Sequence, residues 1–327
     1  MRGLGAAIAL ALAACTPAPA PGPEPVPLPD PGPAAPPVTT VRLAAEGYVD
    51  AGRGGRLWYR VRGSGRDTVL VPLGVMLEEG LAPLAATHTV IFYDPRARGR
   101  SDSLPDSTLA TFDDDVADVE AVRAMFGASR VAVIGYDYHA AVALAWAAAH
   151  PTRASGIVLL SPIAPVDSLE TAYEPADRLA RLDTVAARAL VRMRAAGQDT
   201  TDPVAYCQAF WRVNAPIFVG DTAQAAHVTP TWCDAPPETP ARLARHLAHT
   251  LSSLGVTRDF RALAARVRTP VLIVQGTRDL VVDPAAAEVW ARLLPNARLV
   301  PLPGVGHLPF LEDRDRLLDE LRAFLRQ

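Results

Sequence analysis

Short apolar runs typical of buried strands alternate with helical segments along most of this chain of 327 residues. Strands that alternate with helices at this spacing predict an α/β fold with a doubly wound, mostly parallel sheet. Residues 46–51 and 55–62 come first, and their alternating pattern predicts two strands that pair with each other. The buried-strand runs are residues 68–73, 89–93, 130–135, 156–160, 270–275 and 298–302, and the helical segments are residues 113–126, 138–150, 284–294 and the stretch that ends at Phe324.

The alternation stops between residues 162 and 261, a segment of helices, turns and two cysteines. An interruption of this kind predicts a helical cap inserted into the sheet domain. The core then consists of residues 41–161 and 262–327, which we interpret as one domain. A chain of this length can bury a substantial hydrophobic core.

The charge balance excludes some classes of protein. The chain has 32 basic residues, all of them arginine, against 35 acidic residues, for a formal net charge of −3. No excess of positive charge is available to neutralise phosphates, which argues against a nucleic-acid partner. The 50% share of hydrophobic residues excludes global disorder. Beyond the first fifteen residues no long uncharged apolar run occurs, which excludes a multi-span membrane protein.

The first residues have the pattern of an export signal. Met1 and Arg2 precede an apolar stretch from Leu4 to Ala14, which is shorter than the roughly 20 residues needed to span a bilayer. The ending Leu-Ala-Ala-Cys at residues 12–15 resembles the bacterial lipobox. It implies that residues 1–14 are removed and that Cys15 is lipidated, which would anchor the exported protein in the cell envelope, facing the periplasm or the exterior. An ordinary signal peptide that is cut elsewhere is the alternative.

A proline-rich stretch follows the proposed anchor. Eleven of the 31 prolines lie between Pro17 and Pro37. Such a segment stays extended as polyproline II, at roughly 3.1 Å per residue. We therefore expect residues 15–40 to be a lipid-anchor cysteine and a tether. A disordered spacer without a defined length is the alternative.

Two further cysteines, Cys207 and Cys233, lie in the predicted cap. In an exported domain they suggest one disulfide, which would close a loop of about 26 residues and stabilise the fold by roughly 3 kcal/mol. Two buried free thiols are the alternative.

Four motifs appear in a familiar order. They read Y-D-P-R-A-R-G-R-S-D at residues 93–102, V-A-V-I-G-Y-D-Y-H-A at 131–140, Q-G-T-R-D at 275–279 and G-V-G-H at 304–307. From Tyr48 to its end the chain resembles the α/β-hydrolase superfamily, in particular the proline-iminopeptidase and epoxide-hydrolase-like branch with a helical cap. The resemblance implies a hydrolase that acts on a small molecule, without metal or organic cofactor. It does not predict the oligomeric state.

The second motif departs from the superfamily pattern G-x-S-x-G, which puts the nucleophile on a strained turn. Gly135 is retained, but Asp137 occupies the nucleophile position and His139 replaces the second glycine. Epoxide hydrolases and haloalkane dehalogenases are similar in fold and use a carboxylate nucleophile, which forms an alkyl ester that water then hydrolyses. The resemblance implies that Asp137 is the nucleophile, His307 the base and Asp279 the acid that orients His307.

Other parts of the site match the superfamily less well. The resemblance assigns the oxyanion hole to the backbone N–H groups of Tyr138 and Val75. Tyr138 stands where dehalogenases usually carry a tryptophan that holds halide. The cap offers only Tyr173 and Tyr206 to protonate an opening epoxide. A binding or scaffold module at the cell envelope that kept the fold and lost the reaction is therefore the alternative function.

Some side chains near these motifs allow two interpretations. His139 either reaches the pocket beside Asp137 or serves only in packing. Four aromatic residues of the cap either line an apolar substrate pocket or form the core of the cap. They are Phe210, Trp211, Phe218 and Trp232. His246 and His249 lie three residues apart, but no third metal ligand has a suitable spacing.

Overall fold

A computed structural model of the protein describes residues 45–52, 55–104, 110–165, 175–228, 230–234 and 259–326. The chain divides into two compact units, Met1–Thr40 and Val41–Gln327, and everything described belongs to the second. The predicted signal peptide, Cys15 and the tether lie outside the described residues, as do Tyr173, His246 and His249. No helix in the described part of the chain is long and apolar enough to cross a membrane.

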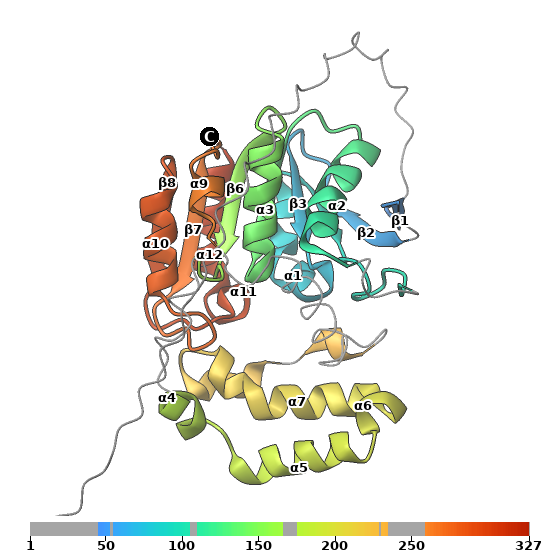
Figure 1. Cartoon of the computed structure of the whole chain (residues 1–327), viewed down its shortest axis with the longest axis vertical. Coiled ribbons are helices and arrows are strands. Elements are labelled where there is room, and N and C mark those ends of the chain that lie inside the picture. Colours follow the sequence, from blue (N-terminus) through green and yellow to red (C-terminus); the bar gives the residue numbers. More distant parts are fainter. Residues whose placement is uncertain are drawn as a thin grey trace, which may run out of the picture. The chain divides into compact units, whose positions relative to one another are not determined.

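An eight-stranded sheet forms the centre of this unit, with the strand order β1-β2-β4-β3-β5-β6-β7-β8 (Figure 1). Strands β1 and β2 pair antiparallel, as do β2 and β4, and all other neighbours are parallel. The strands are β1 (Glu46–Asp50), β2 (Arg56–Arg62), β3 (Thr68–Pro72), β4 (Thr89–Tyr93), β5 (Val131–Tyr136), β6 (Ala154–Leu160), β7 (Val271–Gly276) and β8 (Ala297–Leu302). The predicted α/β fold with a mostly parallel sheet is confirmed.

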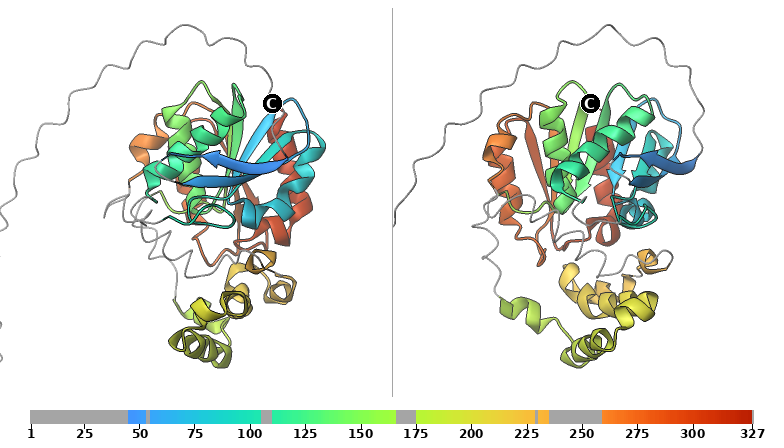
Figure 2. Two further views of the ribbon diagram at one scale, coloured as in Figure 1. Left: turned by 90° about the vertical axis from the view of Figure 1, so that its right-hand side faces the viewer. Right: turned by 45° about the vertical axis from the view of Figure 1, so that its right-hand side comes forward.

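The central strands are apolar along their whole length because helices cover both of their faces (Figure 2). Every residue of β5 and β7 is buried. One core layer lies against α2 (Phe112–Met125), α3 (Tyr138–Ala149) and α10 (Ala285–Leu293), and the other against α1 (Gly74–Leu81) and α12 (Arg314–Leu325). The remaining helices of this part are η1 (Ala82–Ala86), α9 (Arg261–Ala264) and α11 (Pro309–Glu312).

Helix boundaries follow local capping chemistry. Thr111 accepts a hydrogen bond from the Asp114 N–H, and the Asp114 carboxylate accepts one from the Thr111 N–H, which is a capping box at the start of α2. In the region after β6, Asp202 caps α7 and Pro203 follows it as the first helical residue. These side chains fix where each helix begins.

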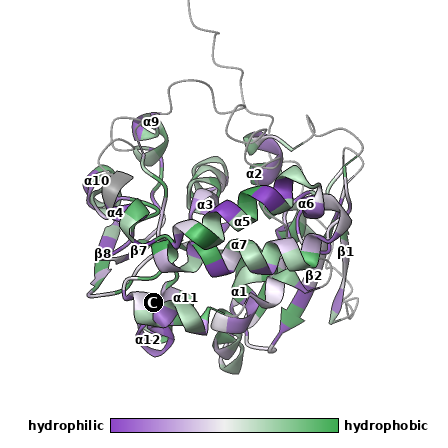
Figure 3. Cartoon of the chain, turned by 90° about the horizontal axis from the view of Figure 1, so that it is seen from below, coloured by the Kyte–Doolittle hydropathy of each residue, from purple (hydrophilic) through white to green (hydrophobic). Residues whose placement is uncertain are grey.

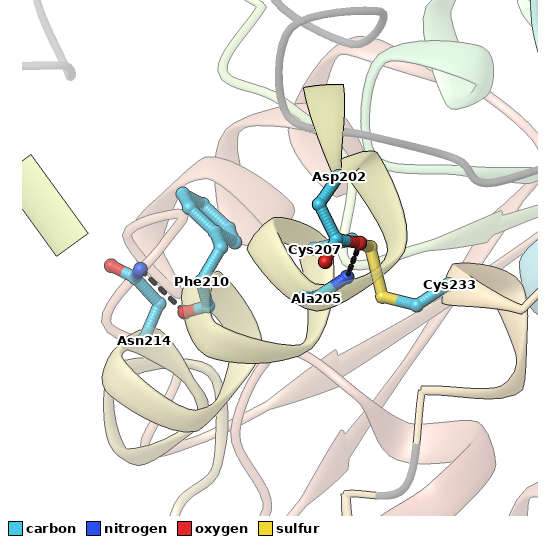
Figure 4. The surroundings of a disulfide bond; sticks show 6 residues. All are labelled: Asp202, Ala205, Cys207, Phe210, Asn214 and Cys233. Carbon is cyan, nitrogen blue, oxygen red and sulfur yellow. Dashed lines mark hydrogen bonds between the residues drawn. A yellow bond between two sulfur atoms is a disulfide. The ribbon is translucent and has the colours of Figure 1, made fainter. Parts of the chain in front are cut away.

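The region between β6 and β7 is helical where it is described. Its elements are α4 (Pro175–Ala180), α5 (Thr184–Ala195), α6 (Gln198–Thr201), α7 (Pro203–Phe218), η4 (Thr222–His227) and η5 (Thr231–Cys233). We call these elements the cap. A disulfide joins Cys207 of α7 to Cys233 of η5, with 5.6 Å between their Cα atoms (Figure 4). Both cysteines are fully buried, so the disulfide lies inside the cap and ties η5 to α7.

Candidate active site

Asp137 stands on a sharp turn between β5 and α3. Its φ of 51° and ψ of −121° lie outside the regions that a non-glycine residue ordinarily adopts. Its N–H donates to the Leu160 carbonyl at 2.9 Å, which joins the turn to β6. A Cβ atom on Gly135 would lie 2.3 Å from the carbonyl oxygen of His139, so only glycine allows this strand and helix to approach so closely. The backbone thus has the shape of a nucleophile elbow.

His139 does not prevent the elbow from forming. The atoms that press on Gly135 belong to the backbone of His139 and its neighbour, whereas the His139 imidazole packs edge-on against the Tyr138 ring at 5.1 Å between centroids. The His139 side chain is 4% exposed. The tight contact at this elbow therefore constrains residue 135 and leaves room for a side chain at residue 139.

His307 and Asp279 form a hydrogen-bonded pair in the loops that follow β8 and β7. The distance between His307 Nδ1 and Asp279 Oδ2 is 2.8 Å. Asp279 also accepts hydrogen bonds from the backbone N–H groups of Val281 and Val282 and from the side-chain amide of Gln275. Asp279 is 1% exposed. These donors hold the carboxylate in place, and it in turn fixes the orientation of the imidazole ring.

Asp137 completes the group from the other side of the imidazole. Its Oδ2 lies 3.8 Å from His307 Nε2, and its side chain is 35% exposed, whereas the His307 side chain is 1% exposed. The three side chains follow β5, β7 and β8, whose carboxyl ends meet at one edge of the sheet (Figure 1). The structure therefore brings together the three residues to which the resemblance assigned catalytic roles, with Asp137 the most accessible of them.

The two carboxylates control the charge of the histidine. Burial lowers the pKa of His307, but the charge and hydrogen bond of Asp279 and the nearby charge of Asp137 outweigh burial and raise that pKa to about 10. The imidazole is therefore protonated at neutral pH. Any reaction that neutralises Asp137 would remove part of this effect and lower the pKa of His307.

Glu312 holds the histidine loop, a role that was not predicted from the sequence. Its carboxylate accepts hydrogen bonds from the N–H groups of Gly306, Leu308 and Gly220 at 2.7–3.2 Å, on both sides of His307 and from the cap. Burial raises the pKa of Glu312, and the three backbone donors oppose that shift. Its only signal in the sequence is its position as the first of two acids, Glu312 and Asp313, that follow the apolar run after His307.

The end of α7 lies directly on the histidine loop. The His307 N–H donates to the Phe218 carbonyl at 2.7 Å, and the rings of these two residues are 5.7 Å apart. Arg181, which follows α4, donates to the carbonyls of Pro216, Val219 and Gly220. The cap is therefore fixed to the histidine loop at this point through backbone hydrogen bonds.

The cap aromatics divide between two roles. Trp211 packs against Phe210, Phe218 and Trp232 at centroid distances of 4.9–5.9 Å, and Trp211 and Trp232 are 6% and 4% exposed. This arrangement is the packed core of the cap. Among these four described residues, only Phe218 stacks on a residue of the triad.

The predicted role of Val75 in the oxyanion hole is wrong. The chain turns from β3 into α1 at Leu73, whose φ is 65°, and the Val75 N–H then donates to Asp94 Oδ1 at 2.6 Å. Asp94 is fully buried and also accepts the Arg100 N–H at 2.8 Å. A donor that already serves a buried carboxylate is not available to an oxyanion.

Tyr138 begins α3, and its side chain points toward α2. Its hydroxyl donates to Asp115 Oδ2 at 2.9 Å, and the residue is 2% exposed. This hydroxyl therefore stabilises the contact between α2 and α3 rather than facing a ligand. The part of the oxyanion hole assigned to the Tyr138 N–H stays a prediction. Tyr206, one of the two cap tyrosines considered for protonating an opening epoxide, lies in α7 and is 6% exposed.

Within the described part of the chain, no group of three His, Cys, Asp or Glu side chains is placed to hold a metal ion. The candidate site consists of the triad and the backbone around it.

Comparison with known proteins gives the family. Residues 74–314 match the model of the alpha/beta hydrolase fold. The chain is 28% identical over 272 residues to the polyketide synthase ThaQ of Burkholderia thailandensis, covering 80% of this chain and 12% of that one. It is 27% identical over 236 residues to a putative carbamate hydrolase, RutD, of Cronobacter sakazakii, covering 68% and 75% of the two chains.

Solved structures agree on the fold. The enol-lactonase from Burkholderia xenovorans matches with a TM-score of 0.64 and 20% identity over 86% of this chain and all of that one. The chain spans 12% to 37% of the length of the first three curated relatives it matches. Because the matched residues 74–314 include the elbow, the acid loop and the histidine loop, the chain belongs to the α/β-hydrolase fold family.

Proposed function

We propose that this hydrolase uses Asp137 as a nucleophile on a saturated carbon, through an alkyl-ester intermediate, and acts on a small and mostly apolar molecule such as an epoxide or a halogenated alkane. The observation that carries the proposal is the position of the Asp137 carboxylate. It stands on the strained elbow, 3.8 Å from the Nε2 atom of a histidine whose Nδ1 is bonded to Asp279.

The first step forms the ester. A carboxylate oxygen of Asp137 forms a bond to the substrate carbon, and the bond from that carbon to the epoxide oxygen or the halogen breaks with its electron pair. The halide leaves as an ion, or the alkoxide takes a proton from water. Asp137 then carries no charge.

The second step is hydrolysis, and the charge change prepares the histidine for it. The ester removes the negative charge beside Nε2, which lowers the pKa of His307 from its resting value of about 10. With its pKa lowered, the imidazolium releases its proton to solvent, where it also neutralises the hydroxide left after an epoxide opens. The neutral imidazole then takes a proton from water, and the hydroxide adds to the ester carbonyl carbon. The alcohol leaves with that proton from His307, and the Asp137 carboxylic acid gives its own proton to the neutral His307, which restores the carboxylate and the imidazolium. Asp279 stabilises the imidazolium throughout.

Acyl substrates fit this nucleophile less well. Several relatives are named for esters, lactones or carbamates. Attack by a carboxylate on such an acyl group would give an anhydride, a reactive species, rather than a stable ester. The aspartate therefore supports an alkyl substrate over an acyl one.

The test is to trap the intermediate. In a His307→Ala protein the ester should form and persist, because no base activates water. We would incubate it with a panel of epoxides and halogenated alkanes and weigh the peptide that contains Asp137. In the unsubstituted protein, turnover in ¹⁸O-water should place ¹⁸O in the Asp137 carboxylate, since hydroxide attacks its carbonyl carbon. Asp137→Asn is the control.

The absence of both adduct and label across the panel would sink the proposal and favour the alternative, a binding or scaffold module. Asp137→Ser gives a second measurement. A gain of p-nitrophenyl ester hydrolysis would show that His307 and Asp279 work as a catalytic pair.

We further propose that the protein is exported and lipid-anchored in the cell envelope through Cys15. The support is the lipobox-like ending at residues 12–15 and the proline-rich segment after it. The mature protein should enter the detergent phase in a phase split and carry a modified N-terminal cysteine. Partition into the aqueous phase with an unmodified N-terminus would overturn this proposal.

A further inference from the structure

The outer helix of the cap, α5, is the least buried long helix in the described chain. None of its twelve residues is buried. Two of the largest exposures of hydrophobic side chains lie on it, Val185 at 73% and Val191 at 69%, and Leu179 of α4 is 63% exposed. Exposed apolar side chains gathered in one place mark an interaction site more often than single ones do.

Arginines are interleaved with these valines. Arg188, Arg192 and Arg194 are exposed, and none of them forms an ion pair with another described residue. From residue 184 to residue 195 the helix has no acidic residue. The acid before it, Asp183, is engaged at the helix start by the N–H groups of residues 185 and 186. The helix therefore presents three positive charges that no acid of the described chain neutralises.

The spacing puts both kinds of side chain on one face. Val185, Arg188 and Arg192 are three to four residues apart, and Val191 lies beside Arg188 on the next turn. Seen from the cap side, α5 lies in front of α7 and shows strongly hydrophobic and strongly hydrophilic residues in alternation (Figure 3). By contrast, Arg178 and Arg181 donate to backbone carbonyls of the acid loop and α7.

We propose that α5 docks the cap onto a bilayer that contains anionic lipid, with Val185, Val191 and Leu179 at the level of the headgroups and the arginines on lipid phosphates. A helix of this composition lies in the interface plane, because its apolar side chains enter the headgroup region and its cations stay at the charged surface. Docking through α5 would turn the cap toward the membrane.

The charge argues against the other occupant, a second copy of the chain. A twofold contact between two α5 helices would bring six arginines together without an acid on either helix to pair with them. An anionic bilayer instead supplies the opposite charge. Its flat surface also suits a single exposed helix better than a partner protein with a groove would.

Vesicle binding by residues 15–327 with Cys15→Ser, which lack both the apolar signal stretch and the site for the lipid, tests the proposal apart from any anchor and apart from catalysis. We expect co-sedimentation with vesicles of phosphatidylcholine and phosphatidylglycerol at about 3:1, and much weaker binding to phosphatidylcholine alone. Since each arginine near an anionic surface is worth a factor of about five, R188E with R192E should weaken binding by roughly 25-fold or more. The valine pair V185S with V191S should weaken it as well.

The matched control is R266E with R268E, which makes the same change in net charge at two exposed arginines outside the cap. If the control pair loses as much vesicle binding, the loss follows from overall charge and not from α5, which would overturn the proposal. So would equal binding to neutral vesicles, absence of binding, or a dimer that V191S disrupts.

A second measurement covers the case in which a charge-reversal variant does not fold. In a Val191→Trp protein, the fluorescence of the introduced indole should shift to shorter wavelength on anionic vesicles and be quenched by brominated lipid. Indole fluorescence that vesicles leave unchanged, relative to the same protein without the substitution, would overturn the proposal.

Discussion

The two halves of the candidate active site are held by different forces. On the elbow side, Asp137 is placed by steric contact, because Gly135 allows α3 to press its backbone against β5. On the other side, His307 is placed by hydrogen bonds to two carboxylates. The buried Asp279 bonds its ring, and the partly buried Glu312 bonds its flanking backbone.

This difference predicts how each half tolerates substitution. The elbow accepts unusual side chains, such as Asp137 and His139, as long as the backbone at residue 135 has no Cβ atom. The histidine side accepts little change in charge, because buried hydrogen bonds to a carboxylate are strong and leave unsatisfied donors when they are lost. Four experiments test this contrast.

The largest effect is expected from Asp279→Asn. The amide would keep the shape of the acid but favour the wrong tautomer of His307, which lowers the rate by about 10⁴-fold in comparable triads. The rate of ester hydrolysis on Asp137 is the measurement. Asp283→Asn, in the same loop, is the control and should change that rate little. A similar loss in both variants would show that the loop, and not the pair, is at fault.

Gly135→Ala should be nearly as damaging, but to the fold. The added methyl group would meet the His139 carbonyl at 2.3 Å, so the free energy of unfolding should fall by about 3 kcal/mol. Urea denaturation measures it. Gly156→Ala on the neighbouring strand is the control, since its methyl group would meet only the movable ring of Phe324 at 3.0 Å. Equal losses would mean that the elbow is not specially close-packed.

Glu312→Gln tests the hydrogen-bonded side without a change of shape. The amide accepts backbone hydrogen bonds more weakly than a carboxylate, and its NH₂ group would face another donor. We expect a loss of about 2 kcal/mol in unfolding free energy and a slower hydrolysis step. Glu288→Gln, at a side chain that is 64% exposed, should change neither. Unchanged stability and rate in Glu312→Gln would show that Glu312 does not hold the histidine loop in place.

The fourth test is a dependence on pH. Because the pKa of His307 is raised in the folded protein to about 10 from a usual value of 6.5, its contribution to stability is complete below pH 6.5 and is lost as the pH rises toward 10. In Asp137→Asn the decline should begin at the same pH, because the pKa of His307 in the unfolded chain is unchanged, and should end at a lower pH, because the folded pKa is raised less. Urea denaturation between about pH 6 and 10 compares the two proteins. Identical curves would show that Asp137 does not influence the histidine.

The strands and the triad could be predicted from the sequence because each depends on local pattern. Buried parallel strands are continuous apolar runs, and those of β3 to β8 appear within two residues of their predicted positions. Asp137, Asp279 and His307 each occupy a recognisable loop motif, so their meeting at one sheet edge follows from the fold.

Contacts between distant loops could not be predicted in this way. The partner of the Val75 N–H is Asp94, nineteen residues away, and the choice depends on how two loops lie in space. Glu312 serves Gly220, which is ninety-two residues distant. No periodicity or spacing encodes such pairs. This explains why the Val75 N–H was wrongly assigned to the oxyanion hole and why the role of Glu312 was not predicted.

The three glycines where the cap meets the acid and histidine loops limit how this protein can be rebuilt. A Cβ atom on Gly276 would lie 2.1 Å from the Gly306 carbonyl, one on Gly306 2.5 Å from the Gly220 nitrogen, and one on Gly220 1.9 Å from the Gly304 carbonyl. The end of β7, the histidine loop and the end of α7 are thus in direct backbone-to-backbone contact, with no space for a side chain between them. A chimera that exchanges caps to change substrate choice must leave residues 216–220 with the recipient core, because a foreign segment there would displace the catalytic histidine.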